Sequence, residues 1–321
     1  MSDSHIRNLD LNLLRVFDAL YEERNVTRAA HRLGLTQSAV SHALNRLRFA
    51  LGDELFVRGP AGMRATPRAA EVGPKVRQAL LQIESALAPS TFVPADTERS
   101  FSIAAGAYTA VVVLPPMVRD FRALAPRAEV RVRGAGIGLA EEPDAGRADV
   151  AMGSFTTIPE RFDSVPLFTE TMVWAIRADQ LGKHERLTMD RLCVQPHVVL
   201  SIAEDGHVVN GAVTDGGLER RVIWDDGGVV RRTCAERGLP PPPTFFAPDA
   251  QSALALVGQS DLAALVPSRL ARLHARGLGL AVFDPPYESR PVQLMMLWRK
   301  EHDSAALAWL RALIDEVAKS V

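Results

Sequence analysis

The sequence predicts an α/β protein made of an N-terminal winged helix-turn-helix, a long linker helix and a larger C-terminal domain of two α/β lobes. Residues 11–51 carry three amphipathic helical patterns separated by short connections. From residue 99 onward, apolar strand-like segments alternate with helical ones. The 321 residues, 47% of them hydrophobic, are enough for two or three globular domains.

Charge is distributed unevenly along the chain. Between Arg24 and Arg68 there are eight arginines and two acidic residues, a net charge of +6. Residues 91–321 instead carry 25 basic and 29 acidic side chains, and the whole chain has a net charge of -1. A basic head on an acidic body is expected of a protein whose one end binds a polyanion such as nucleic acid.

The first two helices are expected over residues 11–23 and from about Thr27 to Gly34. In the first, Leu13, Phe17 and Leu20 recur at helical spacing. The hydroxyl of Thr27 is expected to cap the second helix, and Gly34 is expected to end it. A connection of four residues, 34–37, then leads to the next helix, as in a helix-turn-helix.

The third helix is expected to begin after its cap, Thr36, and to run to about Leu51. Its four apolar residues fall within a stripe about 60° wide; they are Val40, Leu44, Leu47 and Leu51. Short polar side chains crowd the adjoining face, which suits a helix that enters the major groove, where Gln and Asn pair with adenine. The alternative is that this face is only solvated.

Two short strands and a long helix are expected next. Residues 54–58 and 63–66 are predicted to pair around the turn at 59–62, forming a wing. Thr66-Pro67 is a helix start and Pro89 a helix end. The apolar stripe of this helix suits pairing with a copy of itself, or packing on its own domain; it consists of Val72, Val76, Leu80, Ile83 and Leu87.

The N-terminal region that carries the predicted winged helix-turn-helix resembles the LysR-type transcriptional regulator family. The resemblance lies in Leu9-Asp10-Leu11, Ala29-Ala30, Leu33, Leu35 to Ser41, Leu47, Leu51-Gly52, Leu55 to Arg58 and Thr66-Pro67. It implies that helix three faces base edges of double-stranded promoter DNA, although many members carry Pro at the position of Ser38 and Arg at that of His42. The DNA-binding candidates are Thr36, Gln37, Ser38, Ser41, His42, Asn45, Arg46, Arg48, Arg58 and Arg64.

The predicted organisation is residues 1–66 as the winged helix-turn-helix, 67–89 as the linker and dimerisation helix, 90–98 as a hinge and 99–321 as an effector-binding domain. The first lobe, residues 99–171 and 278–321, is expected to hold a parallel sheet with strands at 101–105, 129–133 and 149–153 and a helix at 111–124. The second lobe, residues 172–277, is expected to include the segments 172–177, 198–202, 254–257 and 263–267. Residues 281–283 and 294–298 are expected to lead back into the first lobe, and 305–321 to form a closing helix.

A cleft between two lobes is a usual place for a small ligand. The resemblance implies an effector domain like a periplasmic solute-binding protein, whose pocket includes the loop after the first strand. The candidates are Gly106, Ala107, Tyr108, Thr109, Ser201, Ile202, Asp205, Gly206, His207, Phe246 and Asp249. Backbone amides at the helix start after Gly106 are a candidate carboxylate site. The run from Ser41 to Arg48 looks most like members that answer to aromatic acids, nitroaromatics or flavonoids.

These observations predict a cytoplasmic, bacterial, homodimeric or tetrameric transcription factor that binds DNA, a small effector and RNA polymerase, and that needs no cofactor, metal or membrane. One alternative is a redox regulator using Cys193 and Cys234, the second of which follows the pair Arg231-Arg232. Another is a small-molecule-binding module. An enzyme is not expected, because the sequence has no glycine-rich phosphate loop and no paired metal-binding histidines.

Overall fold

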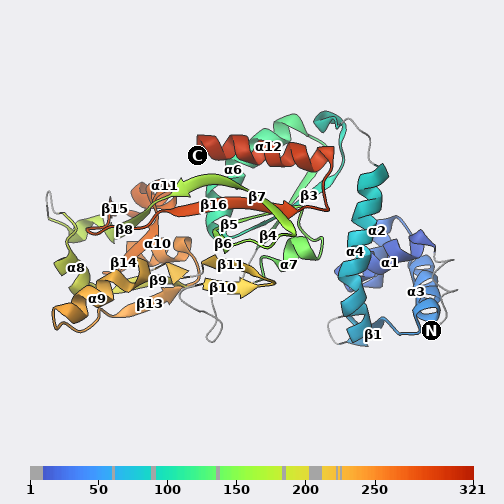
Figure 1. Ribbon diagram of the computed structural model, residues 1–321, viewed down its shortest axis with the longest axis horizontal. Helices are drawn as coiled ribbons and strands as arrows, with labels where there is room; N and C mark the ends of the chain where they lie inside the picture. Colours follow the sequence, from blue (N-terminus) through green and yellow to red (C-terminus); the bar gives the residue numbers. More distant parts are fainter. Residues whose placement is uncertain are drawn as a thin grey trace. The chain divides into compact units, whose positions relative to one another are not determined.

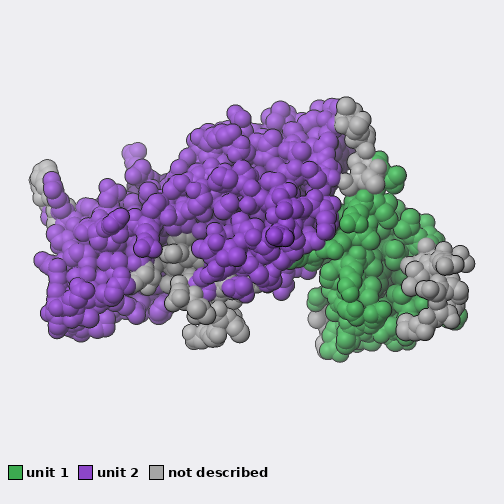
Figure 2. Space-filling model, in the orientation of Figure 1, with its two compact units in different colours: residues 1–89, 144–146 green, residues 90–143, 147–321 purple. Residues whose placement is uncertain are grey.

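The computed structural model describes residues 10–59, 62–87, 92–134, 138–182, 186–201, 212–221, 223–224 and 226–321. The chain divides into an N-terminal unit, residues 1–89 with 144–146, and a C-terminal unit, residues 90–143 with 147–321 (Figure 2). Each unit has buried hydrophobic clusters of its own. No helix within the described ranges is long and apolar enough to cross a membrane.

Three helices form the core of the N-terminal unit: α1 (Leu11–Glu23), α2 (Val26–Leu33) and α3 (Gln37–Leu51). They bury Phe17, Leu20 and Leu47, among others, against one another. The expected cap of α2 was wrong: Asn25, not Thr27, accepts a hydrogen bond from the backbone N of Arg28 at 3.1 Å. Thr36 caps α3 as predicted, accepting from the backbone N of Ala39 at 3.2 Å.

The wing consists of β1 (Phe56–Gly59) and β2 (Gly62–Ala65), paired antiparallel. β1 begins two residues later than expected, because Leu55 is buried with a positive φ of 58° and cannot continue a strand. Asp53 stabilises this bend, accepting hydrogen bonds from the backbone N of Leu55 and the hydroxyl of Thr66, each at 2.7 Å. In the register Arg58 opposes Met63, and Val57 opposes Arg64. The two wing arginines therefore lie on opposite faces of the hairpin.

The linker helix α4 (Pro67–Leu87) begins where the Thr66-Pro67 signal places it, and Thr66 accepts from the backbone N of Ala69 at 3.1 Å. Its apolar stripe is divided between two environments. Val72 and Val76 pack against the core of the N-terminal unit. Leu87 is 80% exposed.

Lobe I of the C-terminal unit is built on a sheet with the strand order β4-β3-β5-β16-β7. The strands are β3 (Ser100–Ala105), β4 (Glu129–Gly134), β5 (Val150–Gly153), β7 (Phe162–Glu170) and β16 (Val292–Arg299). The expected parallel arrangement holds for β3 with β4 and β5, whereas β16 runs antiparallel to β5 and β7. The sheet is therefore mixed, because β16 arrives from the other lobe.

Helices α5 (Ala107–Val112), α6 (Leu114–Leu124), α7 (Glu141–Asp144) and α12 (Ala305–Ser320) complete lobe I. α6 and α12 lie together on one side of the sheet (Figure 1). The helix expected over residues 111–124 starts earlier and is two helices, since Val113 separates α5 from α6. The Pro115-Pro116 pair falls in the first turn of α6, where proline is compatible with a helix.

Lobe II is built on a sheet with the strand order β12-β9-β14-β8-β15, with β13 also paired to β9. The strands are β8 (Met172–Arg177), β9 (His197–Ser201), β12 (Ile223–Trp224), β13 (Thr244–Ala247), β14 (Ala263–Pro267) and β15 (Leu280–Phe283). The helices are α8 (Met189–Val194), α9 (Val229–Glu236), α10 (Ala250–Gly258) and α11 (Ser268–Leu278).

Residues 254–257, expected as part of lobe II, lie in its helix α10, whose buried face is formed by Ala250, Ala253, Leu254 and Val257. One expectation about lobe II was wrong. Residues 281–283 do not lead back to lobe I, because β15 pairs antiparallel with β8 from Leu280 to Phe283. The return to lobe I comes with β16.

The two lobes are connected by the chain segments that pass between them and also by a hairpin. β7 continues into β8 through Thr171, and β15 leads to β16. In addition, lobe I contains the short strand β6 (Phe155–Thr157), which follows β5. It forms a small sheet of order β10-β11-β6 with β10 (Ala212–Asp215) and β11 (Leu218–Arg221). These two strands come between β9 and β12 of lobe II in the sequence. A hairpin from the second half of the chain therefore pairs with lobe I.

His197 generates a prediction about acid stability. Burial lowers the pKa of His197 to about 4, against the raising effect of a hydrogen bond to the backbone of Leu192. The unfolded chain therefore binds a proton near pH 6.5 that the folded chain does not bind until about pH 4. Between pH 6.5 and 4 we therefore expect the free energy of unfolding of the wild type to fall by about 3 kcal/mol more than that of His197→Phe.

The measurement is urea unfolding at pH 7, 6, 5 and 4 followed by tryptophan fluorescence. All four tryptophans lie after residue 170, so the signal reports the C-terminal unit alone. His197→Phe keeps a ring beside Trp174, whose centroid lies 4.8 Å from that of His197, but it does not titrate. Parallel acid losses in the two proteins would contradict the prediction.

Candidate functional site

The polar face of α3 is open to solvent. The exposed candidates from the cap through the helix are Thr36, Gln37, Ser38, Ser41, His42, Asn45 and Arg46. Val40, Leu44 and Leu47 are buried on the other side of the helix. The sequence folds this way because the apolar stripe packs on α1 and α2 and leaves the hydrogen-bonding side chains outside.

Arg48 has an internal role that sequence reasoning missed. Its Nε donates to the carbonyl oxygen of Glu54 at 2.8 Å, and its Nη2 donates to that of Phe56 at 2.8 Å. Its Nη1 donates to Oδ1 of Asn45 at 3.3 Å. The guanidinium of Arg48 therefore connects α3 to the start of the wing, and so positions the exposed polar face of α3 relative to the wing.

A groove of about 370 Å³ lies between α3 and the wing. Ser41 and Asn45 line it from the helix, and Arg58 lines it from β1. Arg64 is exposed on the opposite face of the hairpin and is not among the described residues that line the groove. Of the two wing arginines, Arg58 is therefore the one that shares a surface with α3.

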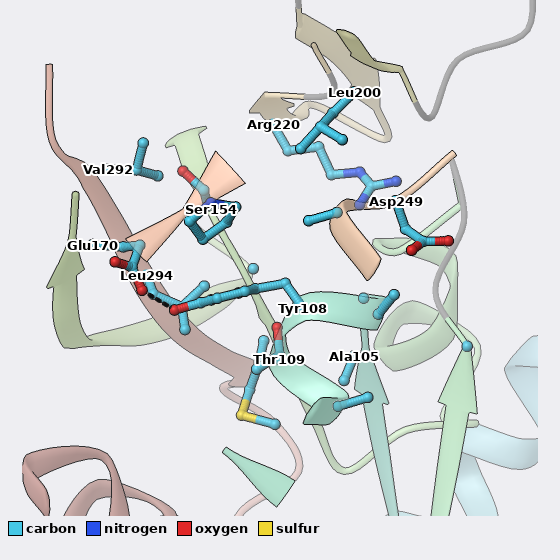
Figure 3. A pocket seen from close by; sticks show the side chains of 18 of the residues that line it. Ala105, Tyr108, Thr109, Ser154, Glu170, Leu200, Arg220, Asp249, Val292 and Leu294 are labelled. Atoms are coloured by element: carbon cyan, nitrogen blue, oxygen red, sulfur yellow. Dashed lines mark hydrogen bonds between the residues drawn. The ribbon is translucent and has the colours of Figure 1, made fainter. Parts of the chain in front are cut away.

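A second cavity, of about 410 Å³, lies between the lobes of the C-terminal unit (Figure 3). Its walls are mostly apolar, with contributions from Val132, Met152, Met172, Leu200 and Leu294. This size and lining are typical of sites for small organic ligands.

The structure brings five of the predicted effector residues to this pocket: Gly106, Ala107, Tyr108, Thr109 and Asp249. The predicted residues Ile202, Asp205, Gly206 and His207 lie outside the described residues. Ser201 is at the end of β9 and Phe246 is 65% exposed on β13; neither is among the described lining residues. Of the segments predicted to form the pocket, the loop after β3 contributes Gly106 to Thr109, and the second lobe contributes Asp249 at the start of α10.

Glu170 holds one end of the pocket in a defined arrangement. It is only 3% exposed and accepts hydrogen bonds from the hydroxyl of Tyr108 and from the backbone N of Thr171, the latter at 3.0 Å. Arg269 lies 3.3 Å from the same carboxylate and stacks over the ring of Phe168 at 4.3 Å. Burial and the carboxylate of Glu170 raise the pKa of Tyr108, so its hydroxyl stays protonated.

Arg220 and Glu170 are lining residues that sequence reasoning missed. Arg220 follows the turn Asp215-Gly216-Gly217 in a hairpin, and two glycines between short strands are a signal for such a turn. Glu170 is the last residue of β7, which begins in a segment with no regular alternation. Its position at the lobe crossing is a property of the topology.

Asp249 has a structural role as well as its place in the lining. Its carboxylate accepts from the backbone N of Ser252 at 2.8 Å and from the hydroxyl of Ser252 at 2.9 Å, which caps α10. Negative charge at a helix N-terminus is stabilised by the helix dipole.

The two cysteines lie next to each other on α8 and α9, and both are buried. Burial raises the pKa of Cys234 to about 11, and the neighbouring thiol of Cys193 adds to the effect. Since the thiolate is the reactive form, Cys234 is a poor nucleophile at neutral pH. The redox interpretation is therefore not favoured.

Comparisons with known proteins agree with both halves of the fold. The profile of the LysR substrate binding domain matches residues 94–319. That of the bacterial regulatory helix-turn-helix protein, lysR family, matches residues 11–70. This chain belongs to the LysR family.

Individual relatives cover nearly the whole of this LysR-family chain. The transcriptional activator NahR of Pseudomonas putida is 31% identical over 96% of this chain and 97% of its own length. The activator NagR of Ralstonia sp is 30% identical over 97% of this chain and 98% of its own. A crystal structure described as a probable transcriptional regulator from Pseudomonas aeruginosa has a TM-score of 0.70 and 32% identity, covering 97% of this chain and 98% of that one.

Each of the two candidate sites lies in a region that one of the family profiles matches. The protein is a LysR-type DNA-binding transcriptional regulator with an effector-binding domain. The exposed face of α3 belongs to the matched helix-turn-helix, and the 410 Å³ pocket belongs to the matched substrate binding domain.

Proposed function

We propose that this regulator responds to a small aromatic compound bearing a carboxylate, bound in the pocket between lobes I and II. The observation that carries the proposal is the pocket itself, a 410 Å³ cavity with apolar walls and a few polar groups. A ring fills the apolar space, and the polar groups fix its orientation. Gly106, Ala107, Tyr108, Thr109 and Asp249 are the effector-binding residues among those predicted.

The DNA-binding surface in this proposal is the exposed face of α3 with the wing. Gln37, Ser38, Ser41, His42 and Asn45 contact base edges, where amide side chains pair with adenine and serine hydroxyls adapt to either partner. Arg46, Arg58 and Arg64 contact phosphates, Thr36 supports the N-terminus of α3, and Arg48 positions the helix against the wing.

The active form is a dimer paired through residues 67–88, and two dimers assemble into a tetramer. The exposed Leu87 and the remaining stripe residues Leu80 and Ile83 supply apolar surface for the pairing, whereas Val72 and Val76 are already used within the N-terminal unit. Pairing places two reading helices on neighbouring turns of the duplex. Effector binding then changes the geometry of the paired dimers on the promoter, where RNA polymerase is contacted.

A nuclease footprint on the DNA upstream of the protein's own gene tests the function as a whole. We expect a protected region long enough for two half-sites separated by whole helical turns. One member of a panel of aromatic acids, including benzoate, cinnamate and 1-naphthoate, should change its length or its hypersensitive bands. The matching carboxamides serve as controls. Protection that no acid alters would contradict the effector proposal and leave the DNA-binding assignment standing.

Gln37→Ala tests base reading by α3. Loss of the amide should cost about 1–3 kcal/mol on the specific site and little on random DNA, because the side chain contacts a base edge. Fluorescence anisotropy with both DNAs at one salt concentration measures the ratio of the affinity for the specific site to the affinity for random DNA. Gln251→Ala removes the same side chain from an exposed position of α10 in the C-terminal unit and should leave this ratio unchanged. An unchanged ratio for Gln37→Ala would overturn the assignment.

Arg58→Ala tests the phosphate contact of the wing. We expect weaker binding to specific and random DNA alike, with the slope of log K against log salt reduced by about 1. Arg119→Ala is the matched control, since Arg119 is exposed on the C-terminal unit and paired with Asp120. A salt slope equal to that of the wild type would show that Arg58 meets no phosphate.

A further inference from the structure

Tyr108 is the aromatic residue of the effector pocket. Among the lining residues that the structure describes, it is the only one with an aromatic ring; the other apolar residues there are Ala, Val, Leu, Met and Pro. Its side chain is partly buried and packs against the hydrophobic clusters of both lobes. Figure 3 shows it reaching from α5 across the cavity to Glu170. The ring therefore forms part of the cavity wall at the junction of the two lobes.

Small residues lie on both sides of Tyr108 in the sequence. They are Gly106, Ala107, Thr109 and Ala110, and all four line the same cavity. Since none of them has a side chain larger than that of threonine, the residues next to Tyr108 do not fill the space that its ring borders. The 410 Å³ cavity therefore offers room for a ligand beside this ring.

The far end of Tyr108 is fixed by a buried cluster of polar groups. Its hydroxyl donates to the carboxylate of Glu170, which is 3% exposed. The same carboxylate accepts from the backbone N of Thr171 at 3.0 Å and lies 3.3 Å from Arg269. Arg269 also donates to the carbonyl oxygen of Thr169 at 3.1 Å. The ring is therefore held by α5 at one end and by this cluster at the other.

A ring that is fixed at both ends suits stacking on a ligand. Aromatic rings attract each other in offset-stacked or edge-to-face arrangements, and this adds to the gain from burying their area. A side chain that is already held in place loses little conformational entropy when the ligand binds. A saturated ring with the same number of carbons also buries apolar area, but it lacks the interaction between π-systems. Tyr108 can therefore distinguish an aromatic ring from a saturated one.

We propose that Tyr108 is the specificity-determining residue of the pocket and that its ring stacks on the aromatic ring of the effector while Glu170 holds Tyr108 in place. This inference rests on the proposed function, since it assigns the group that recognises the ring of the proposed ligand. Aliphatic lining residues such as Val132, Leu200 and Leu294 bury apolar area of either kind of ring. The selection of aromatic over alicyclic acids comes from Tyr108.

Isothermal titration calorimetry on the full chain tests the assignment. The probes are benzoate, cinnamate and 1-naphthoate, each compared with the acid of the same carbon skeleton whose ring system is fully saturated. The carboxylate is common to both members of a pair, so the ratio of their affinities reports on the ring. For the pair that binds most tightly, we expect the wild type to bind the aromatic acid about 3- to 10-fold more tightly than the saturated acid.

Two variants separate the ring of Tyr108 from its hydroxyl. Tyr108→Leu removes the ring and keeps an apolar side chain, so the ratio of aromatic to saturated affinity should fall to about 1 or below, because burial of apolar area then decides both affinities. Tyr108→Phe keeps the ring and removes the hydrogen bond to Glu170. It should keep the ratio within about twofold of the wild type while lowering both affinities, since the ring is held less firmly.

Phe245→Leu is the matched control for loss of an aromatic ring. Phe245 is 53% exposed on β13 and is not among the described lining residues, so the ratio should stay that of the wild type. Tryptophan fluorescence confirms that each variant is folded. If Tyr108→Leu is not, Tyr108→Met takes its place, and the ratio measured for the wild type decides without any variant.

The outcomes separate the two proposals. Failure of the wild type to bind any of the three aromatic acids would overturn the proposed effector class, and the role of Tyr108 with it. If the wild type binds an aromatic acid but binds the saturated acid equally well, the role of Tyr108 alone is overturned. The same holds if Tyr108→Leu retains the aromatic preference, because the ring is then recognised elsewhere, or if Tyr108→Phe loses it, because the hydroxyl is then the group that matters.

Discussion

The buried carboxylate of Glu170 is the interaction on which the arrangement of the two lobes depends. It lies where β7 of lobe I passes into β8 of lobe II, and it joins Tyr108 of α5, the backbone of Thr171 and Arg269 of α11. Removing one partner from such a buried cluster leaves the others with unmet hydrogen bonds, which costs more than the contact itself contributes. The lobe crossing and one end of the pocket are therefore stabilised together.

The helix that carries Tyr108 connects the cores of the two lobes. Val112 of α5 belongs to the hydrophobic core of lobe II, and the adjacent Val113 belongs to that of lobe I. Leu218 makes the reverse connection, since it comes from a hairpin between lobe II strands and is buried in a lobe I cluster. Because close-packed cores resist deformation, a ligand is expected to shift the lobes about the crossing strands while each core stays intact.

The sequence predicted what short-range signals determine. The apolar stripes of α1 and α3, the caps Thr36 and Thr66 and the end of α2 at Gly34 are set by residues close together in the sequence, so their patterns suffice. Asn25 and Thr27 are both good caps, and only the structure shows that the helix begins at Val26. The positions of β15, Glu170 and Arg220 depend on pairing between distant segments, which no local pattern specifies. The two glycines after Asp215 are a local signal for a turn, but they do not specify the strand that the hairpin joins.

Burial, more than residue type, divides the arginines of this chain into roles. Arg58 is exposed beside the polar face of α3 and keeps its charge available to a phosphate. Arg48 donates to two backbone carbonyls, so its guanidinium is largely committed to the fold. Arg220 is 7% exposed and is held in the pocket wall by the pairing of β11 with β6. The same type of side chain therefore lies in water on the wing and away from water in the pocket wall, where a charge interacts more strongly with its neighbours.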